Sequence, residues 1–130
     1  MKITLCGVDF DLEFTVEVQK KMEERFGGSG KEAVEKMLDS TDYAEFQKNM
    51  SFMGCYMANA SEHRKAVRAK MMGQEYSPRE DLREEDFYTL LNPGDIPELT
   101  RVVLEAMKEG NAQKVEVKPS KKNVKATPSG

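Results

Sequence analysis

The chain has 130 residues, of which 33% are charged and 38% hydrophobic, and its formal net charge is −3. This length predicts one domain with a modest core, and no apolar run approaches the ~20 residues of a membrane span. We therefore expect a cytoplasmic protein with no secretory signal. Residues 111–130 carry +4 and the preceding 110 residues carry −7, so we expect no nucleic-acid groove on the acidic body.

The first predicted element is a β-hairpin over residues 2–14, in which apolar and polar side chains alternate. A two-residue turn at Cys6 and Gly7 would place Lys2 opposite Asp11 on the polar face. Because two strands alone are barely stable in water, the hairpin must pack on the rest of the chain. The apolar face comprises Ile3, Leu5, Val8, Phe10, Leu12 and Phe14.

Two short helices are predicted next. Apolar residues recur every four positions over residues 16–26, with Thr15 as the N-cap and two glycines as the stop signal. Ser29 and Glu32 then have the spacing of a capping box, which predicts a second helix that runs to about residue 38.

The third predicted helix, residues 43–60, is the most apolar element of the chain. A helix that is apolar on most sides belongs in a core, so we expect it at the centre with the hairpin on one side. Ser61 is predicted to cap a separate fourth helix over residues 62–72, which is strongly basic. Its narrow apolar stripe, Val67 and Met71, indicates a surface helix.

The fifth predicted helix begins at Ser77 and Pro78, because a serine followed by proline, with Glu80 three positions on, is typical of a helix start. It would carry the acidic run of residues 79–86. The last helix is predicted from about residue 95 to the Gly-Asn pair at 110–111, with apolar residues inward.

These elements predict an α+β domain over residues 1–110 that is mostly α-helical. The N-terminal β-hairpin would pack on a bundle of about five to six short helices. Residues 111–130 are predicted to form a flexible lysine-rich C-terminal tail, with a short extended piece at residues 115–117.

Few residues suggest chemistry. The single histidine, His63, lies among cationic neighbours and has only Glu62 as an obvious acid partner, so we expect it to stay neutral. Cys6 and Cys55 lie in very different contexts and are expected to remain free thiols. Zinc needs about four nitrogen or sulfur ligands, which these residues do not supply. We predict no catalytic residue, no cofactor and no metal site.

Methionine is the residue type that suggests a function, since there are nine in the chain. Methionine fills irregular gaps in cores, but methionine-rich surfaces also adapt to varied protein partners. Both interpretations stay open, and the second predicts a protein-binding groove on the third helix. The candidate partner-binding residues are Met50, Met53, Met57, Phe52, Tyr56 and Met71.

The opening sequence MKITLCGVDFDLEFT, followed by VEVQKKMEERFGG, resembles the tail assembly chaperones of long-tailed phages and prophages. Three further segments resemble those of family members from Gram-positive hosts: residues 53–66, the Tyr-Ser-Pro sequence at residues 76–78 and the ending at residues 115–129. In this family an Asn-Gly turn is usual, whereas this chain has Cys6-Gly7.

The resemblance implies a non-enzymatic chaperone that binds the tape measure protein, keeps it soluble and recruits the major tail tube protein. It also implies a location in the cytoplasm of the bacterial host and absence from the virion, and many members have a longer frameshifted form. The alternatives are a small virion structural protein, such as a head–tail connector or tail completion factor, and another prophage-encoded protein-binding module. Oppositely charged helices at residues 62–72 and 79–88 could also join copies of the chain in self-association.

Overall fold

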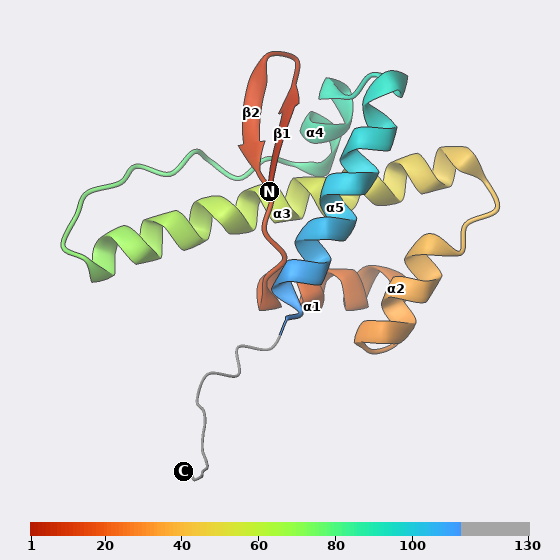
Figure 1. The fold of residues 1–130 in the computed structure, drawn as a ribbon, viewed down its shortest axis with the longest axis horizontal. Helices are drawn as coiled ribbons and strands as arrows, with labels where there is room; N and C mark the ends of the chain where they lie inside the picture. Colours follow the sequence, from red (N-terminus) through yellow and green to blue (C-terminus); the bar gives the residue numbers. More distant parts are fainter. Residues whose placement is uncertain (113–130) are drawn as a thin grey trace, which may run out of the picture.

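The computed structural model describes residues 1–112 as a two-stranded antiparallel sheet and five α-helices, which confirms the α+β, mostly helical fold (Figure 1). The predicted C-terminal tail, with its extended piece at residues 115–117, lies outside the described residues apart from residues 111 and 112. No described helix is long and apolar enough to cross a membrane. The elements are β1 (Lys2–Leu5), β2 (Val8–Asp11), α1 (Val16–Phe26), α2 (Gly30–Leu38), α3 (Tyr43–Met71), α4 (Glu84–Leu90), a 3₁₀ turn (Pro93–Asp95) and α5 (Ile96–Gly110).

The hairpin has the predicted register, with Ile3 opposite Phe10. Cys6 and Gly7 both have positive φ angles, 50° and 76°, which is the backbone of a tight two-residue turn. Val8 was predicted on the buried face, and this is wrong, because its side chain is 48% exposed. β1 contacts α5 and β2 contacts α3, but Val8 lies beside the turn, which projects away from α3 (Figure 1).

The predicted helix starts of α1 and α2 are confirmed. The Thr15 hydroxyl accepts a hydrogen bond from the backbone N–H of Val18, and Ser29 and Glu32 form the expected capping box. Gly27, with a φ of 84°, ends α1. The apolar side chains expected to face inward from the last helix are all buried: Leu99, Val102, Val103, Ala106 and Met107.

The third and fourth predicted helices are one continuous helix, α3, which is 29 residues and about 43 Å long. The expected break at Ser61 is wrong. Ser61 is 1% exposed inside the helix, and its hydroxyl donates a hydrogen bond to the Glu13 carboxylate at 2.9 Å. Because the hydroxyl bonds to a neighbouring element rather than to the local backbone, it does not interrupt the helix.

Residues 74–83, which we call the strap, leave the end of α3 and run back along it to α4 (Figure 1). The sequence predicted a helix from Ser77, and this is wrong, since α4 begins at Glu84. The Leu82 N–H donates to Asn59 Oδ1 and the Leu82 C=O accepts from Asn59 Nδ2, each at 2.9 Å. A backbone tied to a neighbouring side chain in this way does not close the hydrogen bonds of a helix.

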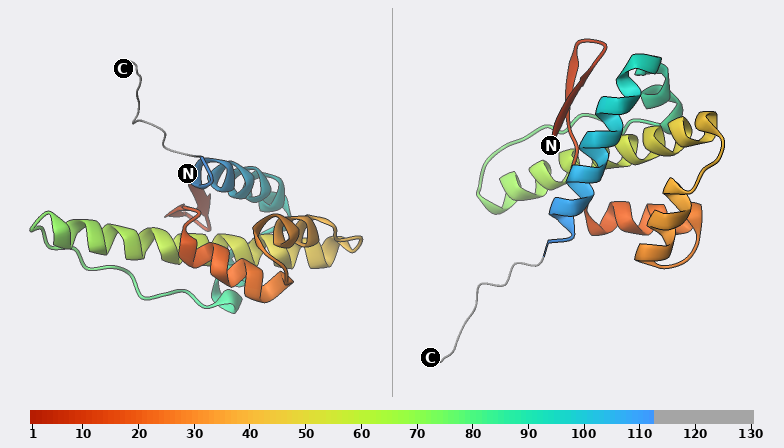
Figure 2. Two further views of the ribbon diagram at one scale, coloured as in Figure 1. Left: turned by 90° about the horizontal axis from the view of Figure 1, so that it is seen from below. Right: turned by 45° about the vertical axis from the view of Figure 1, so that its right-hand side comes forward.

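Helix α3 is the centre of the fold, as the sequence predicted. Every other α-helix and β2 contact it, and Figure 2 shows α5 and the strap on opposite sides of it. Over residues 49–62 only Tyr56 is not fully buried. The core therefore surrounds one helix rather than lying between two layers.

The closest packing around α3 is at Gly54, where an added Cβ would lie 2.7 Å from a ring carbon of Phe87. We expect Gly54→Val to lower the free energy of unfolding by about 1–3 kcal/mol, because the core has no room for the side chain. Urea denaturation followed by circular dichroism measures this change. Gly94→Val is the control, since no atom lies within 4 Å of an added Cβ there. Equal losses in the two variants would contradict the packing.

Candidate functional site

The structure separates the six residues that the sequence suggested for partner binding. Tyr56 is half-buried and its hydroxyl donates to the Glu84 carboxylate at 3.1 Å, whereas Met71 is 80% exposed. A binding groove lined by the methionines of the third helix is therefore wrong for the folded chain, because α3 is enclosed at that level. The remaining residues belong to the core, each with 5% exposure or less: Met50, Met53, Met57 and Phe52.

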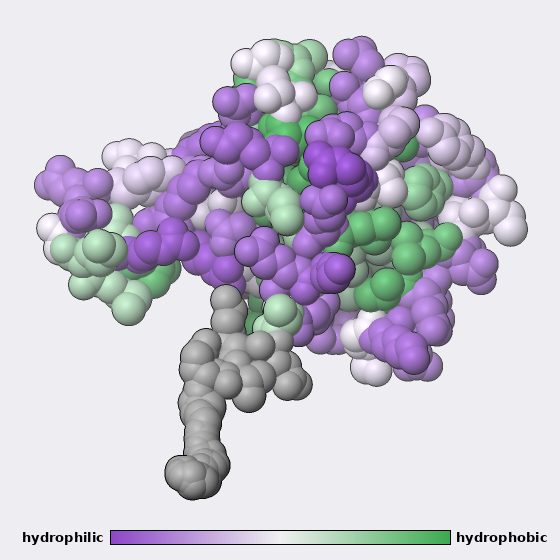
Figure 3. Space-filling view, in the orientation of Figure 1, coloured by the Kyte–Doolittle hydropathy of each residue, from purple (hydrophilic) through white to green (hydrophobic). Residues whose placement is uncertain are grey.

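Exposed apolar side chains gather instead at the projecting end of α3. We call this surface the α3 tip and define it as Val67, Met71 and Met72, all of which are exposed. Val67 is 56% exposed and lies one turn before Met71 on the same side of the helix. Figure 3 shows hydrophobic atoms gathered at the left-hand end of the molecule, where α3 projects.

The sequence predicted only part of this surface. The spacing of Val67 and Met71 indicated a surface stripe, and the structure confirms it. Met72 was not among the candidate residues, and it follows the last helical residue as the C-cap of α3.

The strap covers the opposite face of the same helix end. Ala69 is only 9% exposed, and its C=O accepts a hydrogen bond from the Gln74 N–H at 2.8 Å. At 100° per residue, Ala69 points about 200° away from Val67. The Val67–Met71 face is therefore the side that the chain leaves open.

Glu62 anchors the strap to α3. Its carboxylate accepts hydrogen bonds from the Tyr76 hydroxyl at 2.9 Å and from the backbone N–H of Arg79 at 3.2 Å. Burial acts to raise the pKa of Glu62, but the hydrogen bonds from Tyr76 and Arg79, together with the charges of Arg79 and Lys65, hold the pKa below its usual value. Together with the Asn59 bonds to Leu82, this contact fixes both ends of the strap.

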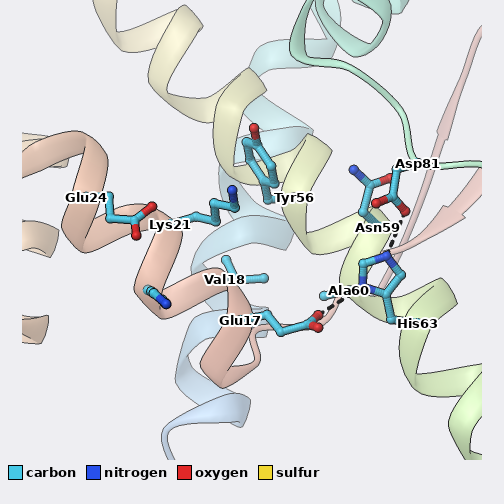
Figure 4. A pocket seen from close by; sticks show the side chains of 10 residues that line it. Glu17, Val18, Lys21, Glu24, Tyr56, Asn59, Ala60, His63 and Asp81 are labelled. Atoms are coloured by element: carbon cyan, nitrogen blue, oxygen red, sulfur yellow. Dashed lines mark hydrogen bonds and ion pairs between the residues drawn. The ribbon is translucent and has the colours of Figure 1, made fainter.

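His63 ties the strap to α1, which corrects the prediction of a neutral histidine with only Glu62 as an acid partner. Its Nδ1 lies 3.0 Å from Glu17 Oε1, and its Nε2 lies 2.7 Å from Asp81 Oδ1 (Figure 4). Hydrogen bonding to Glu17, and then to Asp81, raises the pKa of His63 against the opposing effect of partial burial. A doubly protonated imidazolium can donate to both carboxylates at once.

His63, Glu17 and Asp81 line an open pocket of about 350 Å³ between α1, α3 and the strap (Figure 4). Lys21 and Tyr56 lie on its other side. Within residues 1–112, no group of three or more histidine, cysteine, aspartate or glutamate side chains is placed to hold a metal ion. His63 therefore links α3 to α1 and to the strap.

The basic stretch of α3 is partly neutralised inside the chain. Arg64 pairs with Glu13 and Lys65 with Asp11, each at 2.7 Å. The hydrogen bond from Lys65 lowers the pKa of Asp11. Arg64 and Lys65, which the sequence suggested for contacts between copies, are therefore already paired within the chain.

Comparison with family models, with curated proteins and with solved structures found no match.

The bridging position of His63 predicts a pH effect. Because the folded-state pKa is raised above 6.5, the bridge stabilises the fold fully below that pH and loses this contribution as pH rises through the folded-state pKa. We expect His63→Gln to lower the free energy of unfolding more at pH 6 than at pH 9. Urea denaturation at both pH values measures the difference, and an NMR titration midpoint of 6.5 or below would contradict the bridge.

The strap anchor at Asn59 predicts a local effect. Asn59→Ala leaves the N–H and C=O of Leu82 without their partner, so we expect a loss of about 1–3 kcal/mol in the free energy of unfolding. Trypsin should also cleave more rapidly after Arg79 and Arg83. Gln47→Ala, in the same helix, is the control. Strap cleavage at an unchanged rate in the Asn59 variant would show that these bonds do not hold the strap.

Proposed function

We propose that the chain is a non-enzymatic tail assembly chaperone, which binds the tape measure protein and recruits tail tube subunits during phage tail assembly. The resemblance of the hairpin and first helix to that family supports the proposal. The observation that supports protein binding is the α3 tip, where Val67, Met71 and Met72 are exposed together at the end of one helix. Burying such side chains against a partner is favourable, because it removes apolar surface from water.

The mechanism that this surface supports is hydrophobic capture at the end of α3. An amphipathic helix of the tape measure protein would lay its apolar stripe against Val67 and Met71. Many copies along one long partner bind by avidity, so each single contact can be weak. In this proposal the protein acts in the host cytoplasm and leaves before the virion is complete.

The second candidate is a small virion structural protein, such as a head–tail connector. The α3 tip favours it to the same extent, since a ring subunit also needs an apolar surface for its neighbour. The composition of purified particles separates the two, because a connector stays in the particle and a chaperone does not.

A substitution at the α3 tip tests the chaperone proposal. We expect the tape measure protein to stay soluble when it is co-expressed with the unaltered chain, and its soluble fraction to fall several-fold with Met71→Glu combined with Met72→Glu. Val16→Glu is the matched control, since Val16 is 82% exposed on a different helix. Circular dichroism checks that each variant folds. A tape measure protein that remains insoluble with the unaltered chain rules the proposal out.

A further inference from the structure

We infer that the α3 tip selects an acidic amphipathic helix, in which aspartate and glutamate border the apolar stripe. This inference rests on the proposed function, since it names the chemistry of the partner at the same surface. It is carried by the cations beside Val67 and Met71.

The apolar row has a cation on each side. At 100° per residue, Arg68 lies about 100° to one side of Val67, and Lys70 lies about 60° to the other. A helix that lays an apolar stripe on this row therefore brings its flanking residues close to both cations. Carboxylates at those flanks would form ion pairs, whereas lysines would be repelled.

Among residues 1–112, these two cations are free to pair. Arg64 and Lys65, one turn earlier, are already bound to Glu13 and Asp11. By contrast, Arg68 and Lys70 are exposed, and neither has an ion pair or side-chain hydrogen bond with any residue of the described range 1–112. Within the described range the fold thus pairs the inner cations and leaves the outer ones unpaired.

The charge of the remaining molecule favours docking of the partner at the tip over docking elsewhere on the body. Residues 1–110 carry −7 overall, so an acidic helix is repelled from most of the body and attracted to the tip. The same reasoning disfavours pairing of two tips from two copies, because Arg68 and Lys70 would then face like charges.

Cations in the last turn also interact favourably with the dipole of their own helix. A stability measurement alone would therefore not separate a binding role from a structural one. The test has to compare partners of opposite charge on the same apolar stripe.

Two synthetic helical peptides with an identical leucine stripe provide this comparison, one flanked by glutamate and one by lysine. We expect fluorescence anisotropy to show at least tenfold tighter binding of the glutamate peptide, with a preference that weakens as salt is added. Arg68→Glu combined with Lys70→Glu should abolish or reverse the preference. Lys31→Glu combined with Lys36→Glu, on the exposed side of α2, is the matched control and should retain it.

Equal affinity for the two peptides, or no binding of either, overturns the inference. A dimer in analytical ultracentrifugation that is lost in Met71→Glu also overturns it, because a second copy would then be the occupant of the tip. If the glutamate peptide binds selectively while the tape measure protein is not bound, the inference stands and the proposed function fails. If the tape measure protein is bound but the two peptides bind with equal affinity, the proposed function stands and the inference fails.

Discussion

A helix that is enclosed on every side must satisfy each polar group that it carries into the core. On α3 four of the five buried polar side chains of the described residues reach a neighbouring element. Asn49 donates to the C=O at the end of α2, Ser61 bonds to the segment after β2, and Asn59 and Glu62 bond to the strap. These bonds determine which face of α3 meets which element. The positions of α2, the hairpin and the strap follow from this requirement, since any other rotation of α3 would bury unpaired polar groups.

The parts of the fold that could be predicted have signals within a few residues. The turn at Cys6 and Gly7 and the helix caps at Thr15 and Ser29 are of this kind. The continuity of α3 could not be predicted, because a serine hydroxyl either caps a helix or bonds elsewhere, and the partner of Ser61 is 48 positions away. The strap could not be predicted for the same reason. The side chain that bonds its backbone at Leu82 is Asn59, which lies 23 positions earlier in the sequence.

The candidate site shows a different limit of sequence reasoning. Met57 and Met71 lie in the same helix and in similar apolar spacing, yet one is in the core and the other is exposed. Their difference depends on how far the hairpin and α1 extend along α3, which no local pattern records. For His63, the two carboxylates that surround it come from α1 and from the strap. Its charge state is therefore a property of the tertiary fold.

The core helix and the α3 tip belong to one uninterrupted hydrogen-bonded backbone. A partner that docks at Met71 thus meets a segment that is already folded, and the loss of conformational entropy on binding is confined to side chains and to the partner. Methionine has three rotatable bonds, so these side chains can adjust to stripes of different shape. A rigid backbone with adaptable side chains would hold every copy in the same orientation along a long partner while tolerating variation in the sequence that it contacts.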